Sequence, residues 1–252
     1  MSKRMEWVVE LGRLYGEEIK QGPLFRRLPQ VQTKADLAPL IRQLWWQSDR
    51  FIRTLIDRAD QCDANVGLKK VFIHHANEER NHPAMLVRWM IKHGFLGAKE
   101  SPASVKPLNS TLSCIRLNEQ LLNQSLDDQV IGLNVLGERL ALDFFTAMVP
   151  VLQRLGVLDQ EDQGEHEYWE VHGEVDGKHL RYGLGHCKAV SPDSAAGRRI
   201  QDLLWRYANA YHKMLAGWAG VESVRSLKRV DPQIDARARK VYRRDVTSNA
   251  LT

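Results

Sequence analysis

The segment Val130–Leu152, VIGLNVLGERLALDFFTAMVPVL, decides the fold class that the sequence predicts. Its apolar residues recur at steps of three and four, which is the spacing of one face of an α-helix. That predicted face carries Ile131, Val135, Glu138, Leu142, Phe145, Val149 and Leu152. Glu138 is the only charged residue on it. Since a carboxylate in a core is costly unless it is paired or bound to a cation, Glu138 is a candidate metal ligand, with a buried salt bridge as the alternative.

Helical spacing also dominates the rest of the chain, where alternating strand patterns are hard to find. Helices are predicted over residues 3–20, 35–58, 67–79, 83–93, 111–124, 127–155, 160–182 and 191–217. A loop is expected over 22–33, and Ser191 is the expected N-cap of the last helix because Pro192 follows it. We therefore expect one all-α domain, a helical bundle over residues 1–223. A basic tail over 224–252 follows, with a composition that allows disorder.

The formal net charge of +5 comes from this tail. Residues 224–252 contain eight Lys or Arg and three Asp, a surplus equal to the charge of the whole chain. A basic tail without a nucleic-acid-binding motif is typical of a solvated extension, so nucleic acid is not an expected partner. Three cysteines are too few for a disulfide framework, and no apolar run approaches the roughly 20 residues of a membrane helix. The N-terminal segment lacks the apolar core of a signal peptide, so a cytoplasmic location is expected.

The segment 168–182, YWEVHGEVDGKHLRY, contains a second candidate site. His172, Asp176 and His179 follow one another at intervals of four and three, so a helix would present all three on one face. Two imidazoles and a carboxylate suit iron, manganese or zinc. The alternative is a polar helix face in solvent. Gly173 and Gly177 each cost about 1 kcal/mol relative to Ala in a helix, which indicates a close approach or access to a cavity.

The segment 72–86, FIHHANEERNHPAML, supplies a matching pair. Glu79 and His82 repeat the carboxylate-x-x-His spacing of Asp176 and His179, and dinuclear sites in helical bundles are built from such pairs. Pro83 disfavours helical geometry at His82, so Glu78, Glu79 and His75 remain rival ligands from this segment. Three histidines and three carboxylates without a thiolate suit two iron ions better than zinc.

This order of motifs is similar to that of the haem-oxygenase-like diiron oxidases. The family includes the fatty-acid-cleaving UndA type, the CADD proteins and several amine or amino-acid N-oxygenases, and the resemblance spans about residues 23–220. It implies about seven core helices and a centre of two iron ions. It also implies as metal ligands Glu79, His82, Glu138, His172, Asp176 and His179, of which the last two complete the second iron site.

The resemblance implies a non-haem oxidase or oxygenase that uses O₂ as co-substrate through a peroxo-diferric intermediate. The implied substrate is a small amine or amino acid, oxidised at nitrogen or cleaved at a C–C or C–N bond in a biosynthetic pathway. An external electron donor and a homodimer fit the same resemblance. The alternative within the enzyme class is decarboxylation of a fatty acid to a terminal alkene. Haem is not expected, because a proximal histidine near the N-terminus is missing: no histidine precedes His74.

Two further alternatives remain. Trp89, Leu142, Phe145 and Trp169 lie on or near the predicted ligand faces and are candidates for a substrate pocket, with ordinary core packing as the alternative. The protein could also be a non-catalytic helical scaffold whose basic tail docks onto an acidic partner. A ferritin-like iron store fits less well, because it would show a second Glu-x-x-His motif. Metal analysis distinguishes the enzyme from the scaffold.

Overall fold

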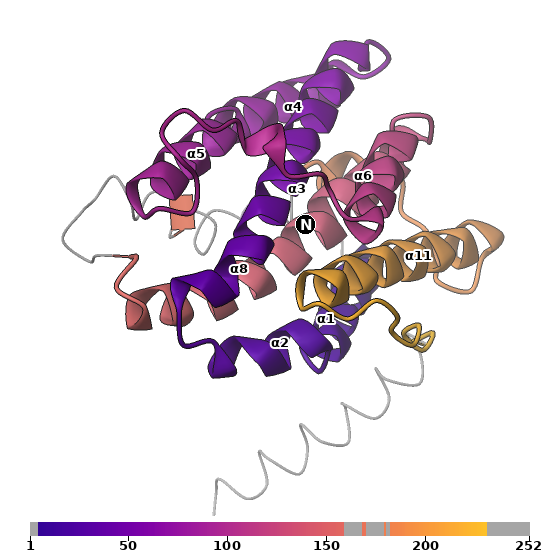
Figure 1. Cartoon of the computed structure of the whole chain (residues 1–252). Helices are drawn as coiled ribbons and strands as arrows, with labels where there is room; N and C mark the ends of the chain where they lie inside the picture. Colours follow the sequence, from indigo (N-terminus) through magenta and orange to yellow (C-terminus); the bar gives the residue numbers. More distant parts are fainter. Residues whose placement is uncertain (1–4, 159–167, 170–178, 180–181, 231–252) are drawn as a thin grey trace, which may run out of the picture.

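The computed structural model describes residues 5–158, 168–169, 179 and 182–230 of the chain (Figure 1). These residues form helices and turns without any strand, which confirms the predicted all-α fold. The helices of ten or more residues are α1 (Glu6–Ile19), α3 (Lys34–Gln61), α4 (Val66–Glu79), α5 (His82–Lys92), α6 (Asn109–Leu121), α8 (Glu138–Arg154) and α11 (Ala195–Trp218). Shorter helical elements are α2 (Pro23–Arg27), α7 (Leu126–Gln129), η2 (Leu28–Gln30), η3 (Pro102–Ser104), η4 (Val130–Gly137) and η5 (Leu184–His186).

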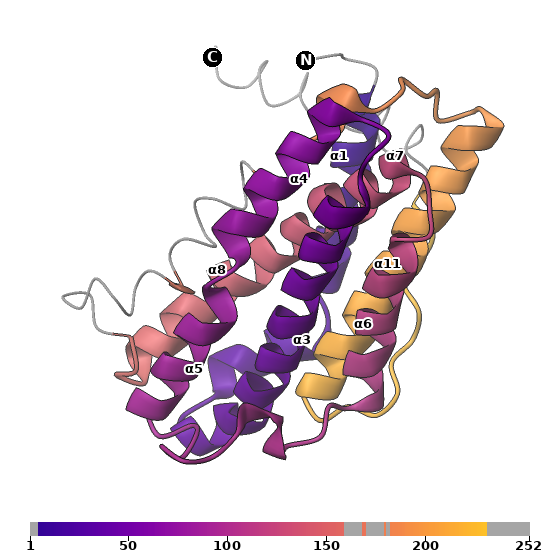
Figure 2. The same ribbon diagram turned by 90° about the horizontal axis from the view of Figure 1, so that it is seen from above.

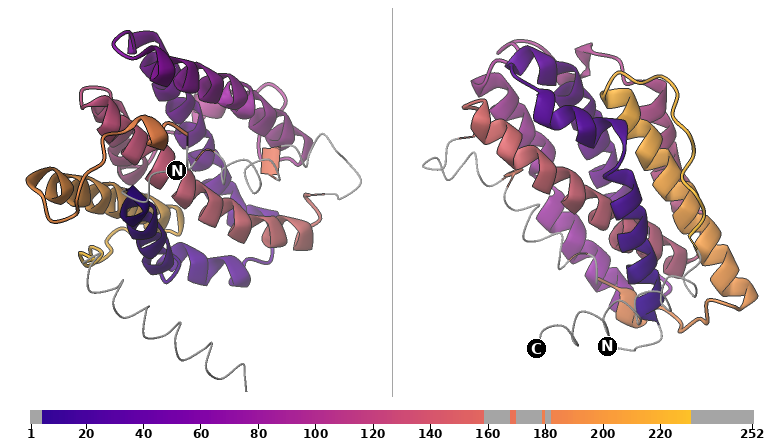
Figure 3. Two further views of the ribbon diagram at one scale, coloured as in Figure 1. Left: turned by 180° about the vertical axis from the view of Figure 1, so that it is seen from behind. Right: turned by 90° about the horizontal axis from the view of Figure 1, so that it is seen from below.

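The long helix α3 lies at the centre of this bundle. It packs against α4 and α5 on one side and against α6 on the other (Figure 2). The helix α1 packs between α8 and α11 (Figure 3). The searched helices include none that is long and apolar enough to span a membrane. The interior between α3, α4 and α8 is where the polar residues described below converge.

The segment predicted to be a loop, 22–33, is partly helical, so that prediction was wrong in part. It contains α2 and the 3₁₀-helix η2. Pro23 occupies the first turn of α2, where a missing N–H costs nothing. Leu24 and Leu28 are 1% and 2% exposed, so burial of these two side chains stabilises a short helix that periodicity alone does not reveal.

The predicted N-cap of the last helix is also wrong by three residues. Ser194 caps α11, because its hydroxyl accepts a hydrogen bond of 3.0 Å from the backbone N–H of Gly197. Ser191 instead contributes its carbonyl oxygen, which accepts hydrogen bonds from both the backbone N–H and the hydroxyl of Ser194. Residues 191–194 thus form a tight turn that precedes the first turn of α11. A Cβ on Gly197 would lie 2.1 Å from the Ser191 carbonyl oxygen, so only glycine fits there.

The predicted continuous helix over 127–155 is interrupted by a π-helix. The segment η4 has π-helical geometry between α7 and α8, and all eight of its residues are buried. Two glycines allow this close packing: a Cβ on Gly132 would lie 2.6 Å from Leu121 Cδ1, and one on Gly137 would lie 3.1 Å from the Tyr207 hydroxyl. Wider turns of this kind are rare and are often found at functional sites. Here the π-helix ends directly before Glu138.

The residues of α8 that face the core agree only in part with the predicted stripe. Glu138, Phe145 and Leu152 are buried as the predicted stripe requires. Leu142 and Val149, which belong to the same stripe, are only half-buried. Their places are taken by Leu140, Phe144 and Met148, each at most 1% exposed. The predicted stripe is therefore correct in part.

Residues 224–230, which the sequence assigns to the basic tail, pack against the bundle. Leu227 is 6% exposed, its backbone N–H donates to Asn209 Oδ1 at 2.8 Å, and its carbonyl accepts from Trp205 Nε1 at 3.0 Å. Arg229 lies over the Trp205 ring at 4.4 Å and pairs with Asp202 at 2.6 Å. The packed body therefore includes residues up to Val230, and residues 231–252 lie outside the described part.

Candidate metal centre

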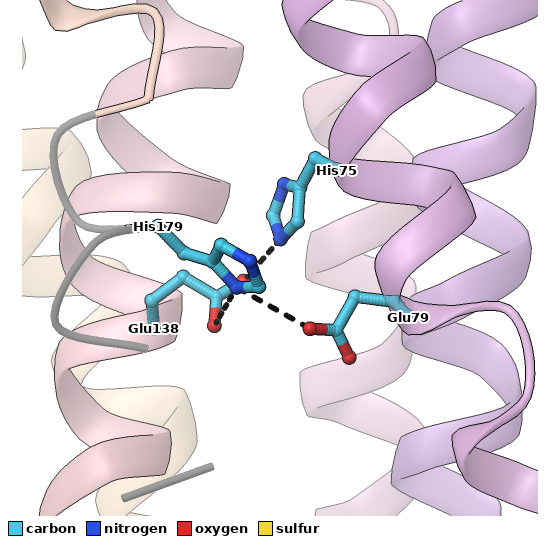
Figure 4. Close-up of side chains that lie close together, drawn as sticks. All are labelled: His75, Glu79, Glu138 and His179. Atoms are coloured by element: carbon cyan, nitrogen blue, oxygen red, sulfur yellow. Dashed lines mark ion pairs between the residues drawn. The ribbon is translucent and has the colours of Figure 1, made fainter. Parts of the chain in front are cut away.

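Three described segments bring four buried side chains together in the interior. The helix α4 presents His75 and Glu79 one turn apart on the same face. Glu138 is the first residue of α8, directly after the π-helix. His179 approaches from the C-terminal half of the chain (Figure 4). Each of the four offers one donor atom, and these atoms lie within 4.8 Å of one another.

The distances within this cluster are short. His75 Nε2 lies 2.9 Å from Glu138 Oε1. His179 Nδ1 lies 3.3 Å from Glu79 Oε1 and 3.8 Å from Glu138 Oε2. The two imidazole rings have centroids 4.4 Å apart. Figure 4 shows that all four side chains point toward one another.

His82 extends the cluster on the side of Glu79. The helix α4 ends at Glu79 and α5 begins at His82, so these residues lie on either side of the break that Pro83 predicts. His82 Nδ1 is 2.6 Å from Glu79 Oε2, and His82 is 5% exposed. Glu79 thus places one carboxylate oxygen beside His82 and the other beside His179.

A cation between these donors fits the hydrogen bonding of the interior. Among the described residues, His75 Nε2, Glu138 Oε1 and His179 Nδ1 are buried and make no hydrogen bond of acceptable geometry. Buried polar atoms are satisfied in the great majority of cases, and such exceptions often mark a missing ion or water. Imidazole nitrogen and carboxylate oxygen are donors that suit iron and other transition metals. The residues present therefore fit a metal ion.

The charges in the cluster are strongly coupled. Burial alone raises the pKa of Glu138, but the adjacent His75 and His179 outweigh it and hold that pKa at about 2. Burial lowers the pKa of His75. For His179 burial also acts to lower the pKa, and the adjacent carboxylate of Glu138 outweighs this and raises it. Glu138 is thus an anion near neutral pH, ready to bind a cation.

A second layer of buried polar residues lies behind His75. Arg58 on α3 is 1% exposed, and its guanidinium lies over the Phe72 ring with Cζ 4.0 Å from the centroid. It donates to Asn134 Oδ1 at 2.7 Å and contacts His75 Nδ1 at 3.2 Å. Burial lowers the pKa of Arg58 to about 9, so the side chain remains cationic at neutral pH.

Sequence reasoning did not single out Arg58 or Asn134, although the signal that found Glu138 applies to both. Arg58 follows Leu55 by three residues on the buried face of α3. Asn134 is the only polar side chain within the buried run Val130–Gly137. A polar residue on an apolar face is costly without a partner, so such positions are candidates for a functional role.

The predicted ligands are placed as follows. The structure brings Glu79, His82, Glu138 and His179 together, with the rival His75 in the same cluster. The other rival, Glu78, is 34% exposed, and its Oε2 lies 3.2 Å from His179 Nε2 at the edge of the site. His172 and Asp176 lie outside the described residues.

Aromatic side chains surround the cluster on the side of His82. Tyr168 meets the His82 ring at 6.0 Å, and the Phe145 ring lies 5.7 Å from Tyr168 and 5.6 Å from Trp169. Trp89 donates from Nε1 to the Val157 carbonyl at 2.9 Å and stacks on Phe95, as a core residue does.

A cavity of about 60 Å³ borders Glu79 and Glu138. Of the four residues predicted for a substrate pocket, its described lining includes Phe145 and not Trp89, Leu142 or Trp169. Leu142 is half-buried on α8, and the two tryptophans belong to the aromatic packing beside the centre.

An all-α chain with a buried cluster of imidazoles and carboxylates has the character of a helical metalloprotein with nitrogen and oxygen ligands. The model of a family described as iron-containing redox enzymes matches residues 74–212, a range that includes the whole cluster. The chain belongs to this family, in agreement with its resemblance to the haem-oxygenase-like diiron proteins. No curated protein matches the chain.

Proposed function

We propose that the protein is a non-haem diiron enzyme that uses O₂ to oxidise a small amine or amino acid. The assigned ligands are Glu79, His82, Glu138, His172, Asp176 and His179. Iron held by these residues would supply the O₂-dependent redox chemistry, and the chain supplies the geometry and a dry interior. Membership of a family of iron-containing redox enzymes supports an enzyme over a scaffold with a docking tail.

The observation that carries this proposal is the convergence of donor atoms in the interior. Glu138 and His179 are 2% and 0% exposed, and each has a polar atom without a hydrogen bond from the described residues. A buried carboxylate is costly unless it is paired or bound to a cation. Iron at this point would neutralise Glu79 and Glu138 and satisfy His179 Nδ1.

The residues around the centre hold the donors and exclude water. His82 fixes one oxygen of Glu79 through the contact of 2.6 Å. Tyr168 and Trp169, at 1% and 0% exposure, cover the same side of the centre with aromatic rings. Exclusion of water strengthens electrostatic interactions within a site and suppresses side reactions.

The cavity beside the centre supports a small amine or amino acid over a fatty acid. Its volume of about 60 Å³ is several times the roughly 10–15 Å³ that one water molecule needs, which is room for a small substrate. Its described lining contains the carboxylates of Glu79 and Glu138 and no Lys, Arg or His. Iron would neutralise these two carboxylates, so the preference rests on the rest of the described lining. It offers no cationic side chain to the carboxylate of a fatty acid, and aromatic rings such as Phe144 and Tyr207 favour a substrate ammonium group.

The test is the iron content and Mössbauer spectrum of protein that is reconstituted anaerobically and then exposed to O₂. We expect two iron ions per chain and the spectrum of a coupled pair. The variant Glu138→Gln keeps the size of the side chain but removes its charge, so it should lose iron. Glu119→Gln, which makes the same change at an exposed position on α6, is the matched control and should retain it.

Metal-free or mononuclear protein would falsify the dinuclear proposal, and so would full iron content in Glu138→Gln. The substrate class is tested separately. Fe(II)-loaded protein is mixed with short-chain amines, amino acids or fatty acids, and the rate of O₂ uptake is recorded. Uptake accelerated only by fatty acids would contradict the proposed substrate class.

A further inference from the structure

Arg58 fixes the direction of the hydrogen bonds behind the metal centre. A guanidinium group has N–H donors and no acceptor. Any polar side chain in hydrogen-bond contact with it must therefore offer a lone pair. Because Arg58 is 1% exposed, bulk water does not compete for these contacts.

Asn134 is oriented by this constraint. Arg58 Nη1 lies 2.7 Å from Asn134 Oδ1. Exchanging the amide oxygen and nitrogen would set two donors against each other at that distance, so the oxygen must face Arg58. The amide nitrogen then faces the other way, and Asn134 Nδ2 lies 2.9 Å from His75 Nδ1.

His75 Nδ1 thus faces two donors. Asn134 Nδ2 approaches it at 2.9 Å and Arg58 Nη2 at 3.2 Å. This nitrogen must accept, and in a neutral imidazole the proton then resides on Nε2. A metal-binding histidine normally shows the opposite arrangement, in which the nitrogen away from the metal donates its N–H to a carboxylate or carbonyl group.

We infer that His75 is a positioning residue and not an iron ligand. Arg58 and Asn134 hold its ring in the Nε2–H tautomer, and Nε2 lies 2.9 Å from Glu138 Oε1, in contact but without the angle of a hydrogen bond. The other oxygen of Glu138, on the side of His179, is left for the metal. The role toward iron rests on the proposed function, whereas the tautomer is a property of the metal-free protein.

The tautomer is measured by long-range ¹H–¹⁵N correlation spectra of metal-free protein with ¹⁵N-labelled histidine. The nine histidines give nine ring systems, and the His75 signals are those missing from His75→Gln. We expect a protonated Nε2 and an unprotonated Nδ1. A proton on Nδ1, alone or together with one on Nε2, overturns the inference.

The variant Asn134→Asp keeps the size of the side chain and replaces the amide donor with an acceptor. The carboxylate still pairs with Arg58, but it offers His75 an acceptor in place of a donor. The new acceptor competes with Arg58 Nη2 for this nitrogen, so the fraction of His75 with a proton on Nδ1 should rise in this variant. An unchanged spectrum would show that Asn134 does not set the tautomer, which contradicts the inference.

Metal binding gives the second readout, with Zn(II) as a diamagnetic probe. The Nε2 proton of His75 should persist in the zinc-loaded protein. Outer-layer partners of metal ligands typically contribute 10–100-fold to metal affinity, so His75→Leu should weaken zinc binding by that order. His75→Gln, which keeps an N–H near the same position, should restore most of the loss. A metal-bound Nε2 signal, or a loss in His75→Gln as large as in Glu138→Gln, overturns the assignment. A failure of the diiron proposal appears in the iron content instead and leaves the tautomer result standing.

Discussion

Arg58 has a cationic side chain in the protein interior, and neighbouring groups contact its guanidinium group on the face and along the edge. Phe72 covers the face of the guanidinium, and Asn134 and His75 lie along its edge. The negative charge of Glu138 acts on Arg58 as well and partly offsets the effect of burial on its pKa. The residue therefore connects the stability of the core to the arrangement of the metal centre.

Replacing Arg58 with Met should destabilise the protein strongly. The change leaves the buried Asn134 Oδ1 without a donor and removes one of the two donors that face His75 Nδ1, and we expect the free energy of unfolding to fall by about 3 kcal/mol. Arg53→Met on the same helix is the control, because Arg53 is 63% exposed and forms a surface pair with Asp49, so its loss should be below about 1 kcal/mol. Urea-induced unfolding measures both. Equal losses would show that burial of Arg58 is not the cause.

At the residue scale, Glu138 and His179 could be singled out from the sequence, each by a different signal. Glu138 was recognisable because a charge interrupts an apolar stripe, and His179 because of its spacing from His172 and Asp176. The partner of Glu138 on α4 was not predictable. Helical spacing places both His75 and His82 on the same side as Glu79 and does not say which of them it contacts. In the structure, α4 ends at Glu79 and α5 begins at His82, and His75 lies beside Glu138 while His82 lies beside Glu79.

At the scale of elements, the beginnings of helices depend on single side chains. Ser194→Ala should lower the free energy of unfolding by about 1 kcal/mol, because it removes the hydroxyl that accepts from the Gly197 N–H. Ser191→Ala, at the position that the sequence predicted as the cap, should change it by less than about 0.5 kcal/mol. Thermal unfolding of the two variants decides between the caps, and the reverse ranking would exclude Ser194.

The helix α3 begins with a capping box whose contribution depends on pH. The Thr33 hydroxyl and the backbone N–H groups of Thr33 and Gln32 hold the pKa of Asp36 below its ordinary value of 3.8. In the unfolded chain the ordinary pKa returns. The stabilisation is therefore present above about pH 4 and is lost as the pH falls through the lower pKa of the folded state.

Asp36→Asn should accordingly be less stable than the natural protein at neutral pH. The difference should shrink as the pH falls below about 4, where the carboxylate becomes protonated. Urea unfolding of both proteins over a series of pH values measures this. A difference that stays constant down to about pH 2 would contradict the pKa direction.

Most long helices were predictable to within a few residues because their apolar faces repeat regularly. The exceptions have local physical causes. The helix α2 depends on burial of Leu24 and Leu28, and the π-helix depends on the close approach of Leu121 and Tyr207 to two glycines. Both are tertiary contacts, which residue spacing does not contain.

At the scale of the whole molecule, the residues after α11 complete the core. Leu227→Ala should lower the free energy of unfolding by about 2–3 kcal/mol, because the side chain is 6% exposed and packs against the bundle. Ser226→Ala changes an exposed neighbour and should have little effect. Calorimetry of both variants tests whether this segment stabilises the domain, and two similar melting temperatures would refute it.

Metal binding should stabilise the whole fold, because the donors come from segments far apart in the chain. A ligand that binds only the folded state adds about 2.7 kcal/mol when its free concentration is 100 times its dissociation constant. Anaerobic Fe(II) should therefore raise the melting temperature, and a chelator should reverse the rise. Glu138→Gln should show a much smaller shift, and a full shift in that variant would argue for iron binding elsewhere.

In the π-helix, the number of residues matters more for the position of Glu138 than the identity of its apolar side chains. Each residue of an α-helix turns the chain by about 100°. The π-helix holds about one residue more per turn. The loss of one residue between Val130 and Gly137 would close a wide turn to α-helical geometry and leave the aim of Glu138 unchanged. The insertion of one residue would instead rotate everything that follows relative to α4, and Glu138 would point away from His75 and Glu79.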